Sequence, residues 1–483
     1  MSDISDSIHK YSTERENKFM AFTYHPPTRV GCPICEKLKE IDINPIIDTQ
    51  SGRASSANNF PFHNWYNFVL GYTPKFPEFI LKREGITEND LVVDPFMGSG
   101  TTLVACKYLG IPSSGVDAND FMAIAAAVKL NWSRDIEKII ETKNKLIDRI
   151  ETDLSSFDWY GVQEQKDAHN QISIYDLDNT ELKSFMEYAQ KYRPEMLVER
   201  YMSDKPFVKA HVIKEAINDI VDSDYLDLFK MALSSILVKI SNVSYGPGFG
   251  VKKAKDDVDV QGIFNEKINR MIADLQLVNQ KQIDTPSTVQ LGDARSISEY
   301  YEHDSVELMI TSPPYPGDHE YTKHTRLELI FDGLANDIKE FRKIKKRMIR
   351  GSTTNIYKDD NDRALVEEFQ SIKEVTDLIQ ERLDEDNATS GFEKLYTKLV
   401  WEYFGGMYKT LEECYKVLKP NGKIALLVSD SHAFKMVHIQ TAKILEEIGL
   451  EIGYSNSEIL LWQHKKSTSH KYDLREDIII LQK

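Results

Sequence analysis

A strand-to-helix junction near residue 100 restricts the fold of this chain more than any other segment. Three apolar residues, 91–93, lead into a glycine-rich turn, and an apolar helix-like segment follows it. Glycines permit a tight turn and a close ligand approach, and the first helical turn presents N–H groups without intrahelical partners. Gly98 and Gly100 alone favour an ordinary tight turn, so a second motif is needed to predict a ligand site. The turn comprises Asp94, Pro95, Phe96, Met97, Gly98, Ser99, Gly100, Thr101 and Thr102.

An acidic residue follows the next expected strand, in the segment GVDAND. Asp117 stands where the acid of a dinucleotide-binding fold accepts hydrogen bonds from ribose hydroxyls. The third glycine of the dinucleotide fingerprint is missing, so the pattern departs from that of dinucleotide enzymes.

Apolar strands and turns alternate with helix-like segments along the rest of the chain. Further strands are expected in VELMITSPPYPG, in VLKPNGKIALLVSDS and in the closing LREDIIILQK. This alternation predicts an α/β fold, with a mainly parallel sheet covered by helices on both faces. Two charged segments, 133–285 and 319–395, are expected to be helical insertions.

The second motif is Thr311-Ser312-Pro313-Pro314-Tyr315, directly after the expected strand 306–310. The carboxyl end of a strand is where open α/β sheets bind their ligands. Two prolines stiffen the turn, Ser312 and a neighbouring carbonyl can accept hydrogen bonds from an amino group, and Tyr315 offers a ring for stacking. A rigid loop with a core tyrosine is the structural alternative. Base-pocket and packing roles are both open for His319, Glu320, Tyr321 and His324.

Together, the two motifs resemble those of S-adenosylmethionine-dependent amino-methyltransferases that act on DNA bases, the N4-cytosine/N6-adenine family. The resemblance covers residues 70–130, 286–318 and 400–483, and it implies a Rossmann-like fold with a mainly parallel seven-stranded sheet. It assigns the catalytic loop to Ser312, Pro313, Pro314 and Tyr315. It assigns S-adenosylmethionine binding to Phe76, Asp94, Pro95, Phe96, Gly98, Gly100, Thr101, Thr102, Asp117 and Asp293.

The resemblance divides the chain into core segments and additions. The core is expected at 61–132 with the cofactor half, at 286–318 with the catalytic loop, and at 396–483 with the C-terminal half. An N-terminal extension, 1–60, precedes it. The insertion 133–285 is the favoured target-recognition region, and 319–395 is a second, basic helical insertion.

The expected chemistry follows from the poor nucleophilicity of an exocyclic amino group, whose lone pair is delocalised into the ring. Hydrogen bonds from that group to Ser312 and the Pro313 carbonyl would localise the lone pair for attack on the methyl donor. The target base must first leave the helix. Serine at the first motif position resembles the N4-cytosine enzymes, whereas Asp or Asn is commoner in the N6-adenine enzymes, so the resemblance favours N4 of cytosine. Carbon-5 methylation is disfavoured because no cysteine here follows a proline.

The net charge of −16 argues against nonspecific nucleic-acid coating but permits a local basic surface. Double-stranded DNA is the expected partner, and a cognate restriction endonuclease is a candidate partner. A purely structural role is equally open for the run 339–350. The residues predicted to contact DNA are Lys252, Lys253, Arg342, Lys343, Lys346, Arg347 and Arg350.

Cysteine usage and hydropathy predict a cytoplasmic protein. Four cysteines cannot form a disulfide framework, no apolar run approaches the ~20 residues of a membrane span, and the N-terminus lacks signal-peptide features. Cys32 and Cys35 form a C-x-x-C that supplies only two of the four ligands of a zinc site, so a turn with two free thiols or a redox-sensitive pair is favoured over a metal site.

Two rival functions remain at this point. An RNA methyltransferase is one, because similar loops serve RNA substrates, although no RNA-binding module is recognisable. A catalytically silent binding protein of the same fold is the other, and cofactor binding without methyl transfer would identify it.

Overall fold

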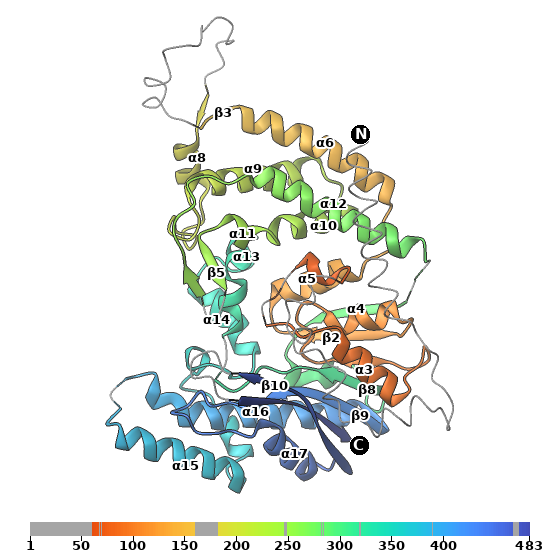
Figure 1. Cartoon of the computed structure of the whole chain (residues 1–483), viewed down its shortest axis with the longest axis vertical. Coiled ribbons are helices and arrows are strands. Elements are labelled where there is room, and N and C mark those ends of the chain that lie inside the picture. The colour runs from red at the N-terminus through yellow and green to blue at the C-terminus, as the bar shows by residue number, and fades with distance from the viewer. Residues whose placement is uncertain are drawn as a thin grey trace, which may run out of the picture. The chain divides into compact units, whose positions relative to one another are not determined.

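The computed structural model describes residues 60–66, 68, 70–159, 182–245, 249–281, 283, 285–317, 320–388, 390–466 and 473–483 (Figure 1). The described residues form two compact units. The helical unit contains those of Ser133–Lys281 and Arg326–Asp337, and the sheet unit contains those of Asn17–Trp132, Gln282–Thr325 and Ile338–Lys483. The C-x-x-C of Cys32 and Cys35, and His319, lie outside the described residues.

The sheet unit is built on seven strands in the order β10-β11-β9-β8-β1-β2-β7. Neighbouring strands pair in parallel except at β11, which is antiparallel to both β9 and β10. This arrangement confirms the predicted Rossmann-like fold with a mainly parallel seven-stranded sheet. The strands are β1 (Val92–Asp94), β2 (Ser113–Asp117), β7 (Ser287–Leu291), β8 (Val306–Thr311), β9 (Leu418–Ser429), β10 (Asn456–Lys466) and β11 (Asp473–Gln482).

Helices cover both faces of this sheet because successive strand residues point to opposite sides. Val93 and Leu426 pack in one buried cluster with residues of α16 and α17, whereas Val92 and Leu427 pack in another with residues of α3 and α4. Figure 1 shows these two helix pairs on opposite faces of the sheet. The helices are α3 (Lys75–Glu84), α4 (Thr101–Tyr108), α5 (Asp120–Leu130), α16 (Tyr396–Val417) and α17 (Thr441–Ile452).

Three neighbouring strands bring the predicted motifs to one edge of the sheet. The central strand β1 ends at Asp94, β2 ends at Asp117, and β8 ends at Thr311, one residue before Ser312. Because all three strands run parallel, their carboxyl ends lie side by side. The fold itself therefore positions the glycine-rich turn and the catalytic loop, residues 312–315, as neighbours.

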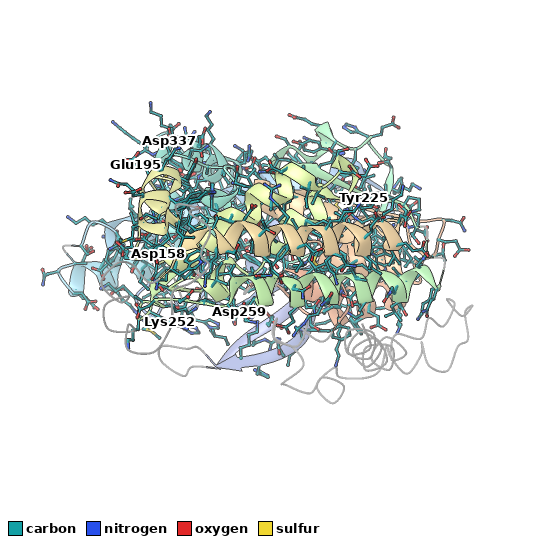
Figure 2. The ribbon with its side chains drawn as sticks, turned by 90° about the horizontal axis from the view of Figure 1, so that it is seen from above. Asp158, Glu195, Tyr225, Lys252, Asp259 and Asp337 are labelled. Carbon is teal, nitrogen blue, oxygen red and sulfur yellow. The ribbon has the colours of Figure 1, made fainter. Side chains whose placement is uncertain are left out.

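The helical unit packs long amphipathic helices around an apolar core. On α6, Ile139, Leu146 and Ile150 are fully buried at helical spacing. Figure 2 looks onto α6 and α12, which pack against each other, and labels Asp259, the residue that caps α12. No helix among the described residues is long and apolar enough to span a membrane. The unit contains α6 (Ile136–Ser155), α8 (Phe185–Tyr192), α9 (Asp204–Ile220), α10 (Ser223–Ser234), α11 (Leu237–Ile240), α12 (Val260–Asn279) and α13 (Arg326–Phe331), with the short pairs β3 (Phe157–Asp158) with β4 (Lys183–Ser184) and β5 (Val243–Tyr245) with β6 (Phe249–Val251).

The segment 319–395 is divided between the two units. Residues 326–337 belong to the helical unit, where Asp332 accepts hydrogen bonds from the Ser234 hydroxyl at 2.7 and 2.9 Å. Burial raises the pKa of Asp332 to about 6. The helices α14 (Ile338–Arg347) and α15 (Gln370–Glu385) belong to the sheet unit, and α15 packs against α16.

Candidate active site

A cavity of about 530 Å³ opens in the sheet unit at the edge where β1, β2 and β8 end. Its wall contains Gly98 and Asp117 on one part, and Ser312 and Tyr315 on another. The two predicted motifs therefore face a single space. A volume of this size lies in the range typical of small-molecule sites.

The two glycines of the cofactor turn, residues 94–102, have different roles. Both adopt positive φ angles, +52° at Gly98 and +86° at Gly100. A Cβ added at Gly98 would meet nothing within 4 Å, whereas one at Gly100 would lie 3.1 Å from the Ala126 Cβ. Gly98 therefore leaves open space on the cavity wall, and Gly100 allows α4 to begin close to α5.

Asp117 joins the end of β2 to the cofactor turn. Its Oδ2 accepts a hydrogen bond from the Gly98 N–H at 2.9 Å, and its Oδ1 accepts one from the Asn119 N–H at 2.8 Å. Burial raises the pKa of Asp117 to about 6, against the lowering effect of these two bonds. Each carboxylate oxygen keeps a further acceptor position, so ribose hydroxyls could donate to it.

Five of the ten residues predicted to contact the cofactor do not line the cavity. Asp94 is fully buried behind it, and its Oδ2 accepts a hydrogen bond from the Tyr72 hydroxyl at 2.8 Å. Burial raises the pKa of this carboxyl group. Tyr72 itself lines the cavity and also bonds Thr102. The residues absent from the wall are Phe76, Asp94, Gly100, Thr102 and Asp293, whereas Pro95, Phe96, Gly98, Thr101 and Asp117 are on it.

Two of these five residues, Phe76 and Asp293, lie next to residues of the cavity wall. The Phe76 ring is fully buried and makes edge contacts with Tyr72 and Trp462, both of which line the cavity, so it supports the wall from behind. Asp293 accepts hydrogen bonds from the backbone and side chain of Arg295. The wall instead includes the neighbouring Ala294.

The catalytic loop presents Ser312, Pro314 and Tyr315 to the cavity, while Pro313 is buried. The Ser312 hydroxyl lies 2.9 Å from the Leu427 carbonyl, to which it can donate, and 3.2 Å from the Tyr315 hydroxyl. A hydroxyl has one hydrogen and two acceptor lone pairs, so Ser312 can still accept a bond from an amino group in the cavity.

The end of α14 supplies cavity residues that the sequence did not identify as such. Arg347, Met348 and Ile349 line the cavity. The Arg347 guanidinium donates to the Ala118 carbonyl at 3.1 Å and pairs with the Asp120 carboxylate. Tyr321, for which the sequence left a base-pocket role open, also lines the cavity, and Tyr72 and Met122 are further wall residues without a motif to signal them. Only the fold brings these separate segments to one edge.

The residues predicted to contact DNA differ in their exposure and in their partners within the protein. Arg350 is 6% exposed, pairs with Asp360 at 2.9 Å and donates to the Met348 carbonyl at 2.6 Å, so its guanidinium bonds within the protein and its contact with DNA stays a prediction. Arg347 faces the cavity, and Lys346 pairs with Asp359 at 3.2 Å. The remaining predicted residues are exposed: Arg342, Lys343, Lys252 and Lys253.

The cavity suits a cofactor that combines a charged, an apolar and a ribose-containing part. Asp117 offers acceptors, Gly98 leaves open backbone, and Phe96, Met122 and Ile349 offer apolar surface. These features fit S-adenosylmethionine. Beside them, the catalytic loop offers a hydroxyl acceptor and an aromatic ring. Such a site can bring a planar amino-bearing substrate to a bound methyl donor.

Comparisons with known proteins agree with this geometry. The family model described as DNA methylase matches residues 72–127, which include the cofactor turn and Asp117. The Type II methyltransferase M.BsoBI of Geobacillus stearothermophilus is 21% identical over 458 residues, which cover 88% of this chain and 86% of that protein.

Two further relatives match over most of their length. The Type II methyltransferase M.AvaI of Anabaena variabilis is 23% identical over 442 residues, covering 85% of this chain and 82% of that protein. M.MvaI of Kocuria varians is 22% identical over 406 residues, covering 80% of each. These matches support an amino-methyltransferase of the N4-cytosine/N6-adenine family, whose methyl donor is S-adenosylmethionine.

Proposed function

We propose that this protein methylates N4 of a flipped cytosine within a specific double-stranded DNA sequence. One observation carries the proposal: the proline-stiffened loop with Ser312 and Tyr315 lines the same cavity as Gly98 and Asp117. Transfer of a methyl group requires the acceptor and donor sites to be contiguous, and this cavity supplies both.

The chain positions the acceptor amino group and improves it as a nucleophile. Ser312 accepts a hydrogen bond from the amino group, which localises the nitrogen lone pair. Tyr315 stacks on the base, a contact worth about 1–3 kcal/mol. When bound, S-adenosylmethionine supplies the electrophilic methyl group. Solvent can take the proton that the amino group loses, so no general base is assigned.

Cytosine is favoured over adenine because serine occupies the first position of the loop motif, at Ser312. The N4 and N6 amino groups pose the same chemical problem, so the cavity accommodates the reaction at either base. N6 of adenine is therefore the second candidate target.

Sequence recognition is assigned to the helical unit. It carries Lys252 and Lys253 as exposed cations, and DNA phosphates are their natural partners (Lys252 is labelled in Figure 2). The relatives are named Type II methyltransferases. We propose on this basis that a cognate restriction endonuclease accompanies the protein.

Transfer of tritium-labelled methyl groups tests this proposal. The purified protein is incubated with labelled S-adenosylmethionine and unmethylated plasmid DNA or RNA, and the digested nucleosides are separated. We expect label in N4-methylcytosine from DNA. Ser312→Ala should lower the rate about 100-fold, as when one preorganised hydrogen bond is removed, and leave cofactor affinity unchanged. Label confined to RNA, or a full rate with Ser312→Ala, would contradict the proposal.

A further inference from the structure

We propose that Glu476 is a positioning residue of the catalytic loop, fixing the Tyr315 hydroxyl so that the ring forms a rigid wall for the target base. This inference rests on the proposed function, because it assigns a role within the base-holding part of the same site. Glu476 lines the cavity from β11, which no sequence motif marked.

The Glu476 carboxylate is held in the sheet by three donors. It is 3% exposed, and β11 lies between β9 and β10 in the sheet. The Tyr315 hydroxyl donates to its Oε1 at 3.1 Å. Lys465 bonds the same oxygen, and the Gln463 amide bonds Oε2. Burying a carboxylate costs desolvation free energy unless hydrogen-bond donors and a positive charge compensate it. Lys465, Gln463 and Tyr315 supply this compensation for Glu476.

The geometry gives the tyrosine one orientation. Burial and the nearby Glu476 charge raise the pKa of Tyr315 well above its ordinary value, so its hydroxyl stays protonated and donates. Its single hydrogen goes to Glu476, and Ser312 therefore meets only its oxygen. Ser312 is held separately by the Leu427 carbonyl of β9. Two neighbouring strands thus anchor the two polar side chains of the loop.

Strand-borne anchors of this kind affect the reaction more than binding. A misplacement of about 1 Å in a reacting group can cost about 100-fold in rate. Without the Glu476 bond, the Tyr315 ring still stacks but samples more orientations, so the amino group meets the methyl donor in line less often. The hydrogen bonds of Glu476 go to Tyr315, Gln463 and Lys465, whereas Asp117 bonds Gly98 and Asn119, so cofactor affinity should not change.

A double-mutant cycle with Tyr315→Phe and Glu476→Gln tests the inference. Tyr315→Phe keeps the ring and removes only the hydroxyl, and Glu476→Gln keeps the shape and removes the charge. We expect each to lower kcat about 10-fold with the KM for DNA within about 2-fold, and the double variant to be no slower than the slower single. Glu458→Gln is the matched control. Glu458 is an exposed glutamate of β10, the strand paired with β11, and its carboxylate pairs with Arg83 of α3 rather than with a residue of the catalytic loop.

Several outcomes overturn the inference. A full kcat with Tyr315→Phe does so by itself, whether or not Glu476→Gln folds, and thermal melting reports that folding. Multiplied losses in the double variant would show two independent effects. A rise in KM with kcat unchanged would indicate a role in DNA binding. If the wild-type protein binds the cofactor but methylates no DNA, the proposed function fails instead.

Discussion

We predict that Asp117 sets the pH range in which the cofactor binds. Its pKa in the free protein is about 6, raised by burial, so the carboxylate is charged above that pH and protonated below it. The charged form accepts more hydrogen bonds from ribose hydroxyls, and binding should weaken as the pH falls through about 6. The loss can reach about tenfold per pH unit, because one proton is involved.

Calorimetric titration of S-adenosylmethionine between pH 5 and 8 measures this dependence. Asp117→Asn should weaken binding about 10-fold or more at pH 8, as expected for a lost charged acceptor, and should flatten the pH profile. A wild-type dissociation constant that stays the same from pH 8 to 5 would contradict this role for Asp117.

Alanine substitutions at Gly98 and Gly100 form a matched pair: the first should mainly lower cofactor affinity, and the second should mainly lower stability. Gly98→Ala places a methyl group in open space on the cavity wall but strains the backbone at its φ of +52°, so cofactor affinity should fall and stability should drop by about 1 kcal/mol. Gly100→Ala crowds Ala126 at 3.1 Å in addition to its unfavourable φ, so stability should fall by about 1–3 kcal/mol. Melting curves and cofactor titration separate the two, and a reversed pattern would contradict the assignment.

At the scale of elements, α14 ends in a segment that closes one wall of the cavity. Arg347→Ala removes the bonds to Asp120 and Ala118, and it removes a positive charge that lowers the pKa of Asp117. We expect cofactor affinity to fall about 5- to 10-fold, with the loss growing at lower pH. This loss corresponds to about 1 kcal/mol, the net contribution of one ordinary hydrogen bond, because Arg347 supports the wall through Asp120 and Ala118.

Arg342→Ala on the same helix is the control for Arg347. Arg342 is exposed, so its replacement should leave the cofactor dissociation constant unchanged and act only on DNA binding. If both substitutions lowered cofactor affinity equally, the effect would come from the positive charge of α14 as a whole and not from the position of Arg347 in the cavity wall.

The elements with local signatures could be predicted from the sequence. The strand before Asp94, the strand before Ser312 and the helix after Gly100 are each marked by apolar runs and turn residues, and the structure contains all three. Parallel strands then determine which loops meet. Fold and motif placement therefore follow from local patterns and topology.

The side chains that complete the cavity carry no such signature. Tyr72, Met348 and Glu476 lie in three distant segments, and each reaches the cavity through helix or strand packing. Phe76 and Asp94 show the converse, since both belong to the matching pattern but lie behind the wall, where they support Tyr72. A residue that belongs to a motif can therefore be predicted to lie near the site, but whether its side chain lines the cavity depends on how the helices and strands pack.

At the scale of the whole molecule, a net charge of −16 means that DNA must be met by a local basic surface. Replacing both Lys252 and Lys253 by Gln should weaken DNA binding and reduce the slope of log K against log salt by up to about 2, roughly 0.9 for each lost phosphate contact. Cofactor affinity should not change.

Lys145→Gln provides a comparison, because Lys145 is exposed on α6 and pairs with Glu141 at 2.7 Å. For the Lys145→Gln variant, the slope of log K against log salt should match that of the wild type. Fluorescence anisotropy with a labelled duplex at several salt concentrations supplies the slopes. An unchanged slope in the double variant would place the DNA-binding surface elsewhere.

The most direct test is to express the chain in a methylation-deficient host and sequence the host DNA by a method that reports modified bases. We expect exocyclic amino methylation, at N4 of cytosine, in one recurring sequence context, and a much lower level of it with folded Ser312→Ala. Unmodified DNA in the presence of folded, cofactor-binding protein, or equal modification by Ser312→Ala, would contradict this expectation.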